Sequence, residues 1–129
     1  MSGKTKILIV DDDSYSVILI KEYLKPLQAE IFSVRNGKLA VDFCKNHSVN
    51  LVITDILMPV MDGIEELKKL RKINPNIAVV AETAYATREK LDEIVNVGFD
   101  AVITKPFLKE DFFNVIFRLL QKTDDIIHG

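Results

Sequence analysis

The sequence predicts an α/β fold in which one open, five-stranded parallel sheet is covered by helices on both faces. Short apolar runs rich in Ile and Val recur along the 129 residues, and longer segments with helical spacing separate them. The length and the 48% hydrophobic content suit one globular domain with a single core. Strands that alternate with helices favour parallel pairing, because each parallel neighbour requires a crossover connection. We therefore expect one doubly wound domain.

Five segments have the composition of buried strands. Strands of a parallel sheet are covered on both faces, so they are nearly continuous apolar runs with no strict alternation of polar residues. The expected strands span residues 6–10, 30–34, 51–54, 77–81 and 100–104.

Local signals mark the boundaries of the helices between these strands. We expect Ser14 to cap the first helix and Pro26 to end or bend it. The segment "RNGK" (35–38) leads into the second helix, and "INPN" (73–76) separates the third helix from the fourth strand. Gly63 is expected to adopt a backbone conformation closed to other residues in the loop after the third strand.

The charge and cysteine content exclude several classes of protein. With 17 basic and 19 acidic residues, the net charge of -2 does not favour binding to nucleic acid or to an anionic membrane. No apolar run approaches the roughly 20 residues of a membrane helix, and no signal peptide is recognisable, so we expect a soluble, cytoplasmic protein. Cys44 is the only cysteine, which excludes a disulfide framework, and its apolar neighbours predict a buried thiol.

Polar residues follow four of the five expected strands. In open α/β sheets, ligands bind outside the carboxyl ends of the strands, so these residues should meet at one edge of the sheet. They are Asp11, Asp12 and Asp13 after the first strand, Asp55 after the third, Thr83 after the fourth and Lys105 after the fifth.

This set of residues predicts phosphoryl chemistry. Crowded carboxylates repel one another unless a cation neutralises them, and donors that are all oxygen suit Mg²⁺. Lys105 and Thr83 would supply a charge and a hydrogen-bond donor to a phosphate. Because the sequence has no glycine-rich phosphate loop, bound nucleotide is a poor candidate. The remaining interpretation is that one carboxylate accepts a phosphoryl group as a nucleophile.

Four motifs carry a resemblance to a known family. "ILIVDDD" (7–13), "LVITDILMPVMDG" (51–63), "ETA" (82–84) and "ITKPF" (103–107), in this order and spacing, resemble the receiver domain of two-component response regulators. The resemblance implies a flavodoxin-like fold and a single receiver domain over 1–129, with a core of about 5–122 and no output domain. Such a domain is either a single-domain regulator or the receiver of a hybrid histidine kinase. It also implies a phosphorelay protein that takes a phosphoryl group from a histidine kinase or a histidine phosphotransfer protein and then changes conformation to regulate a partner.

The resemblance further implies that the chain is not a turnover enzyme, although it would catalyse its own Mg²⁺-dependent phosphorylation and dephosphorylation. It assigns a role to each matching position. Asp55 would be the phosphoacceptor and also a Mg²⁺ ligand. Asp12 would ligate Mg²⁺ directly, Asp11 mainly through water, and Leu57 through its backbone carbonyl. Thr83 would bind the phosphate, and Lys105 would pair with it.

Some positions near the site vary within the family. Pro106 follows what is usually a cis peptide bond. Many receivers carry an aromatic switch residue where this chain has Val102, so Tyr85 is the candidate to replace it. Bulky side chains at Leu57 and Tyr85 predict a long-lived aspartyl phosphate, because they would hinder the approach of water.

Two other functions are weighed against this interpretation. Asp11 and Asp13 form a D-x-D after an apolar strand, which is similar to haloacid-dehalogenase-type phosphatases. The chain is short for that family, and Asp55 would have no role in it. A pseudo-receiver that only binds partners is the second alternative, and the presence of all the key residues argues against it.

Two apolar surfaces are candidates for partner contacts. Val17 and Ile18 lie off the expected core stripe of the first helix, which would suit docking of the helix that bears a phosphohistidine. The last helix has a second apolar stripe of Phe113, Phe117 and Leu120. This stripe predicts either a homodimer or partner surface, or a wide core face.

Overall fold

The computed structural model describes residues 4–56, 62–84 and 87–128, and side chains as far as residue 121. All five expected strands are present within two residues of their predicted limits, and all of them are parallel. They are β1 (Lys6–Val10), β2 (Glu30–Val34), β3 (Leu51–Asp55), β4 (Ala78–Thr83) and β5 (Ala101–Thr104).

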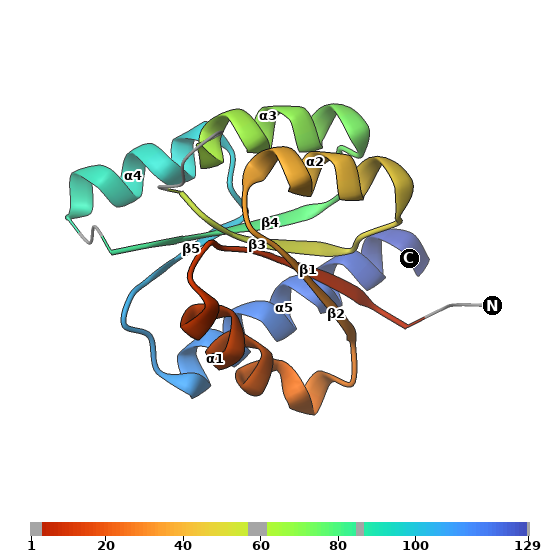
Figure 1. Ribbon diagram of the computed structural model, residues 1–129, viewed down its shortest axis with the longest axis horizontal. Helices are drawn as coiled ribbons and strands as arrows, with labels where there is room; N and C mark the ends of the chain where they lie inside the picture. The colour runs from red at the N-terminus through yellow and green to blue at the C-terminus, as the bar shows by residue number, and fades with distance from the viewer. Residues whose placement is uncertain (1–3, 57–61, 85–86, 129) are drawn as a thin grey trace.

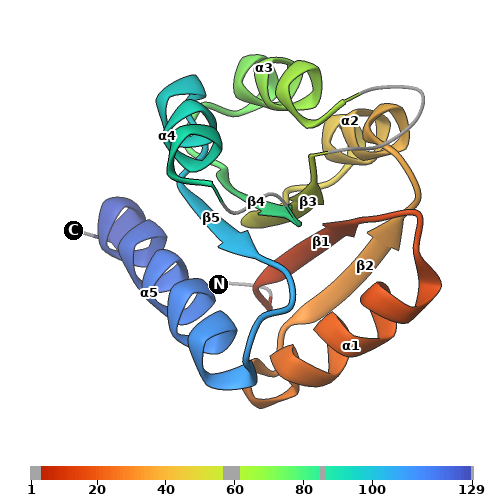
Figure 2. The ribbon, with the colours of Figure 1, turned by 90° about the vertical axis from the view of Figure 1, so that its left-hand side faces the viewer.

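The strands form one sheet in the order β2-β1-β3-β4-β5, with helices on both faces (Figure 1). This is the flavodoxin-like order, so the predicted fold class is confirmed. Figure 2 shows the helices on the two faces of the sheet. One face is covered by α1 (Ser14–Leu24) and α5 (Lys109–His128), and the other by α2 (Gly37–Asn46), α3 (Gly63–Ile73) and α4 (Arg88–Val97).

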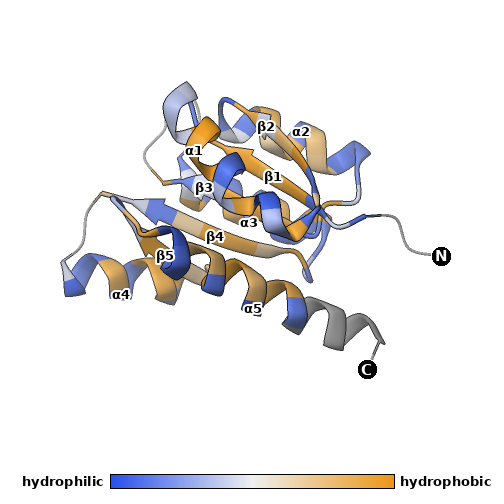
Figure 3. Cartoon of the chain, turned by 90° about the horizontal axis from the view of Figure 1, so that it is seen from below, coloured by the Kyte–Doolittle hydropathy of each residue, from blue (hydrophilic) through white to orange (hydrophobic). Residues whose placement is uncertain are grey.

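Each face of the sheet has its own hydrophobic core, because successive residues of a strand point to opposite faces. On the α2–α3–α4 side the sheet contributes residues such as Val52 and Val79, and on the α1–α5 side residues such as Ile53 and Val80. The strands are apolar along nearly their whole length, whereas polar residues lie on the outer faces of the helices (Figure 3). A sheet buried on both sides leaves only its edges open to a ligand.

The first helix begins differently from the prediction that Ser14 caps it. The cap is Asp13, which has an extended backbone and whose Oδ1 accepts a hydrogen bond from the Tyr15 N–H at 3.2 Å. Its Oδ2 accepts a second one from Ser16 Oγ at 2.9 Å. Ser14 is the first residue inside the helix. Pro26 lies in a short 3-10 turn, Lys25–Leu27, which directly follows α1, as expected.

Gly63 is required for a reason other than the predicted one. Of the described glycines, Gly98 has a positive φ and Gly63 does not. A Cβ atom at Gly63 would instead lie 2.9 Å from the Cα of Ile56, immediately after Asp55. The glycine therefore lets the start of α3 approach the end of β3.

The two expected apolar surfaces are smaller than predicted. Val17 is half-buried and packs against the core on the α1–α5 side, so its assignment to an exposed patch was wrong. Ile18 is 65% exposed, as expected. On α5, Leu120 also packs against this core, whereas Phe117 is 43% exposed and stacks on Phe113 with a centroid distance of 5.9 Å.

Two further predictions concern the burial of Cys44 and the absence of membrane-spanning helices. Cys44 is buried, as expected, and burial raises the pKa of its thiol to about 11. Among the helices in the described ranges, none combines the length and apolar character needed to cross a bilayer.

Candidate functional site

The candidate site is a row of charged side chains along the carboxyl edge of the sheet, on the face covered by α1 and α5. Strand alternation explains the row, since each member lies two residues beyond a strand residue buried in the core on that side. The backbone ladder extends past two strand ends: the Asp11 N–H donates to the Val34 carbonyl at 3.1 Å, and the Lys105 N–H donates to the Thr83 carbonyl at 2.8 Å. The row consists of Asp11, Asp55, Glu82 and Lys105.

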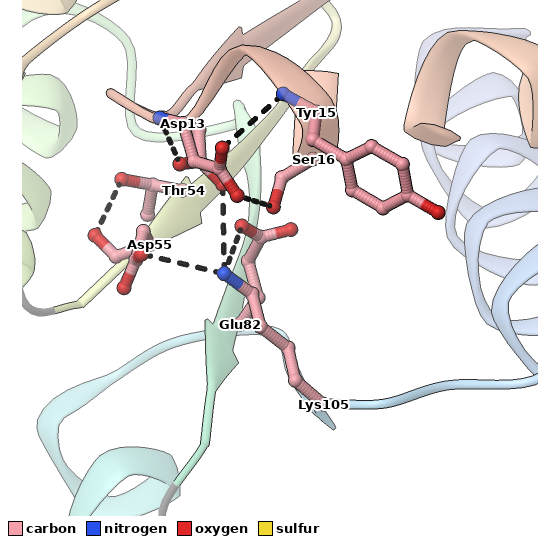
Figure 4. A network of polar contacts seen from close by, with 8 residues as sticks. Asp13, Tyr15, Ser16, Thr54, Asp55, Glu82 and Lys105 are labelled. Atoms are coloured by element: carbon pink, nitrogen blue, oxygen red, sulfur yellow. Dashed lines mark hydrogen bonds and ion pairs between the residues drawn. The ribbon is translucent and has the colours of Figure 1, made fainter. Parts of the chain in front are cut away.

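Lys105 joins three carboxylates from three different strands (Figure 4). Its Nζ donates a hydrogen bond to Asp55 Oδ2 at 3.4 Å. It also lies 3.6 Å from Asp11 Oδ2 and 3.6 Å from Glu82 Oε1. The ammonium is therefore the shared counter-ion of the pocket.

The charges of the pocket shift the pKa values of its members. Burial acts to lower the pKa of Lys105, but the carboxylates of Glu82, Asp55 and Asp11 outweigh it and raise that pKa. For the carboxyl of Glu82, burial has the opposite effect and is the main cause that raises its pKa to about 9. Asp11 and Asp55 raise this pKa further. Lys105 thus stays a cation, and the pocket resists holding all of its carboxylates in ionised form.

Three of the acids fit a divalent metal ion. Asp11, Asp12 and Asp55 each offer a carboxylate oxygen, and these oxygens all lie within 4.8 Å of one another. Asp11 is buried and its Oδ2 makes no hydrogen bond to any residue that the structure describes, whereas Asp12 is exposed. An all-oxygen set that is partly open to solvent suits Mg²⁺, which keeps several waters and uses one or two carboxylates. The donors lie at the ends of β1 and β3, where the strand order reverses and ligands bind in this fold.

The other predicted site residues lie around this row. Thr83 is buried at the end of β4 and lines a groove of about 780 Å³ between α3 and α4, together with Ile64 and Ile94. Val102 packs against the core on that same side. The peptide bond between Lys105 and Pro106 is cis, as predicted. Leu57 and Tyr85 lie outside the described residues.

Glu82 was missed at the sequence level. The motif "ETA" drew attention to Thr83, and β4 was expected to end at residue 81. In the structure β4 continues to Thr83, and Glu82 is paired in register with Asp55 of β3. The period of two in the strand was a usable signal, because it places Glu82 on the same face as Val80.

Comparison with known proteins agrees with a phosphoryl-accepting site at this edge of the sheet. The family model for the response regulator receiver domain matches residues 7–117. Sporulation initiation phosphotransferase F of Bacillus subtilis is 37% identical over 115 residues, which cover 89% of this chain and 93% of that protein. Chemotaxis protein CheY of Halobacterium salinarum is 31% identical over 115 residues, covering 89% of this chain and 96% of that protein.

A solved structure agrees with these matches. The CheY-like receiver domain protein of Methanospirillum hungatei superposes with a TM-score of 0.86 at 30% identity, over 95% of this chain and 98% of that one. A doubly wound sheet with an acidic pocket and a lysine at its carboxyl edge defines the class of phosphoacceptor signalling domains. The chain belongs to the response regulator receiver domain family. Receiver domains are signalling proteins and not turnover enzymes, and the phosphatase alternative with Asp11 and Asp13 is not favoured.

Proposed function

We propose that Asp55 is the residue of this receiver that accepts the phosphoryl group. One observation carries the proposal: Asp55 Oδ2 accepts a hydrogen bond from Lys105 Nζ, and an Asp55 oxygen also belongs to the cluster formed with Asp11 and Asp12. Asp55 thus lies between a fixed cation and a site suited to Mg²⁺. Its side chain is 18% exposed, which leaves it open to a donor from solvent.

The transfer is a displacement at phosphorus. An Asp55 carboxylate oxygen forms a bond to phosphorus, while the bond from phosphorus to the donor's histidine nitrogen breaks and the imidazole keeps its electron pair. Lys105 offsets negative charge on the phosphoryl oxygens, and Thr83 supplies a hydroxyl donor to them. Asp11, Asp12 and Asp55 are the described residues that would hold Mg²⁺. The further ligand that the resemblance implies, the backbone carbonyl of Leu57, lies outside the described residues. Bound there, Mg²⁺ supplies positive charge close to the transferred oxygens.

The donor is a histidine kinase or a histidine phosphotransfer protein in the cytoplasm. Relatives such as the sporulation phosphotransferase indicate this kind of partner. Ile18 is 65% exposed and Tyr15 is 72% exposed on α1, and Leu108 is 72% exposed just beyond Pro106. The segment after Pro106 lies against α1, since the rings of Phe107 and Tyr23 are 6.0 Å apart. An apolar surface formed by α1 and the segment after Pro106 suits docking of the donor helix, although Val17 contributes less than predicted.

Output follows from a shift between conformations that Asp55 phosphorylation biases, with Thr83 and Lys105 as the residues that sense the phosphoryl group. The exposed ring of Phe117 on α5 is a candidate contact for a second copy or another partner. Because Val102 is an aliphatic residue in the core, the switch does not use an aromatic ring at that position.

Intact mass after incubation with acetyl phosphate tests this proposal. We expect one phosphoryl adduct on the wild type that requires Mg²⁺ and is absent from Asp55→Asn. An adduct that persists in Asp55→Asn would show that another residue is the acceptor. If neither acetyl phosphate nor a phosphohistidine donor labels the wild type, the chain is a pseudo-receiver that acts only by binding.

A further inference from the structure

Glu82 is a carboxylate in the phosphoacceptor pocket to which neither the family roles nor the proposed function gives a task. Its side chain is fully buried, at 0% exposed, on β4 beside Asp55. Both of its oxygens are buried, and no hydrogen bond to them is found within the described part of the chain. Among the described residues, the cationic group within ion-pair distance of Glu82 is the ammonium of Lys105, at 3.6 Å from Oε1. A buried polar group without hydrogen bonds is costly, and contact with the Lys105 ammonium offsets part of this cost.

Lys105 is therefore held on two sides. Asp55 and Asp11 approach the ammonium from β3 and from the end of β1, and Glu82 approaches it from β4. A phosphoryl group on Asp55 would bring further negative oxygens to this same ammonium. Since the Lys105 ammonium has three protons to donate and already meets three carboxylates, the new oxygens and Glu82 compete for it.

We propose that Glu82 is a positioning residue that holds Lys105 in the unphosphorylated pocket and competes with the phosphoryl group for this lysine. Removal of Glu82 should release the ammonium and favour the phosphorylated state. A residue so placed tunes how readily this particular receiver becomes phosphorylated. The proposal rests on Asp55 being the phosphoacceptor.

Beryllofluoride, a phosphoryl analogue, provides a binding test at saturating Mg²⁺. We expect Glu82→Met to bind it about fivefold more tightly than the wild type, the factor that one net polar contact to Lys105 is worth. Glu82→Gln keeps an uncharged oxygen acceptor near Lys105, as the protonated acid does, and should bind beryllofluoride nearly as the wild type does. If Glu82→Met does not fold, Glu82→Leu carries the test in its place.

Glu66→Met is the matched control, because Glu66 is equally buried but lies on α3 and bonds to Thr54 on the other side of the sheet. It should bind beryllofluoride as the wild type does. Equal or weaker binding by the apolar Glu82 variants would overturn the proposal. A similar gain in Glu66→Met would also overturn it, since the effect would then be general loosening of the fold.

A second readout does not depend on Asp55 chemistry. The Nζ and Cε resonances of Lys105, measured by NMR without beryllofluoride, should shift in Glu82→Met and stay unchanged in Glu66→Met. Unchanged Lys105 resonances in Glu82→Met would show that the contact does not exist. Failure of the proposed function has a different signature, namely no beryllofluoride binding by the wild type while the Lys105 resonances still respond to Glu82.

Discussion

Thr54 Oγ1 donates a 2.7 Å hydrogen bond to Oε1 of Glu66, inside the molecule and one residue before Asp55. Both side chains are fully buried, and the bond ties α3 to the end of β3. The other oxygen of Glu66 has no hydrogen-bond partner. A buried carboxylic acid thus lies near the end of β3 on both faces of the sheet. Glu66 lies on the face covered by α3, and Glu82 lies on the opposite face beside Lys105.

Stability should depend on pH through Glu66. Burial raises its pKa from 4.5 to about 7, although the hydrogen bond from Thr54 opposes the shift. The folded protein therefore binds this proton more tightly than the unfolded chain does. The stabilisation is complete below pH 4.5 and is lost as the pH rises through about 7.

We expect Glu66→Gln to gain stability relative to the wild type as the pH is raised from about 5 to about 8, by at most roughly 3 kcal/mol. Urea unfolding at several pH values measures the difference. Glu65→Gln, at an exposed site on the same helix, should keep the wild-type slope over this range. A constant difference between Glu66→Gln and the wild type would show that Glu66 is not buried as an acid.

The cap of α1 can be tested by a pair of neighbouring substitutions. Asp13→Ala removes the acceptor of two hydrogen bonds at the start of the helix and should lower the thermal midpoint by a few degrees. Ser14→Ala should leave it nearly unchanged, because Ser14 is inside the helix. A larger fall in the thermal midpoint for Ser14→Ala than for Asp13→Ala would show that Ser14 is the cap. Asp13→Ala should also keep acetyl phosphate labelling, which a D-x-D phosphatase site would lose.

Arg71 should stabilise the fold without contributing to the chemistry. Its guanidinium donates to the carbonyls of Ile77 and Gly98 and to Oδ2 of Asp100, which also accepts from the Val79 N–H at 2.7 Å. These bonds join α3 and α4 to the amino ends of β4 and β5, opposite the acidic pocket. We expect Arg71→Ala to lose about 2 kcal/mol, and Arg71→Lys to lose somewhat less.

Urea unfolding measures that loss, and the phosphorylation rate of the same variant is its control. Labelling of folded Arg71→Ala by acetyl phosphate should match the wild type. Slower labelling of fully folded Arg71→Ala would mean that the amino ends of β4 and β5 influence the reactivity of Asp55.

Docking of the donor should depend on Ile18. We expect Ile18→Glu to slow phosphotransfer from a phosphohistidine protein at least about tenfold, because it places a charge in an apolar contact. Labelling by acetyl phosphate should be unaffected. Val95→Glu is the matched control, since Val95 is 51% exposed on α4 and away from this surface. Equal transfer to both variants would place the docking surface elsewhere.

The fold and most of the site could be predicted because the relevant signals are local. Five apolar runs define the strands, and parallel pairing brings the residues that follow them to one edge, which is why Asp11, Asp55 and Lys105 meet. Glu82 was not predicted because a charged residue inside a buried strand runs against the apolar pattern used to find strands. The register with Asp55 and the contact with Lys105 show that it belongs to the pocket.

The errors at α1 have a similar origin. Asp13 and Ser14 are both residue types that cap helices, and the choice depends on where the backbone leaves the extended conformation, at Asp13 with φ -95° and ψ 110°. Val17 was assigned to the surface because the expected core stripe was too narrow. In the structure the core between α1, the sheet and α5 is wide enough to take in part of Val17.

The location of the phosphoryl group is the most direct test of the assignment of Asp55. The protein would be labelled with acetyl phosphate and Mg²⁺ and then reduced with borohydride, which converts an aspartyl phosphate to homoserine, and the modified residue would be located by tandem mass spectrometry. We predict homoserine at position 55 alone. Modification at Asp11, Asp12 or Glu82 in place of Asp55 would contradict the assignment.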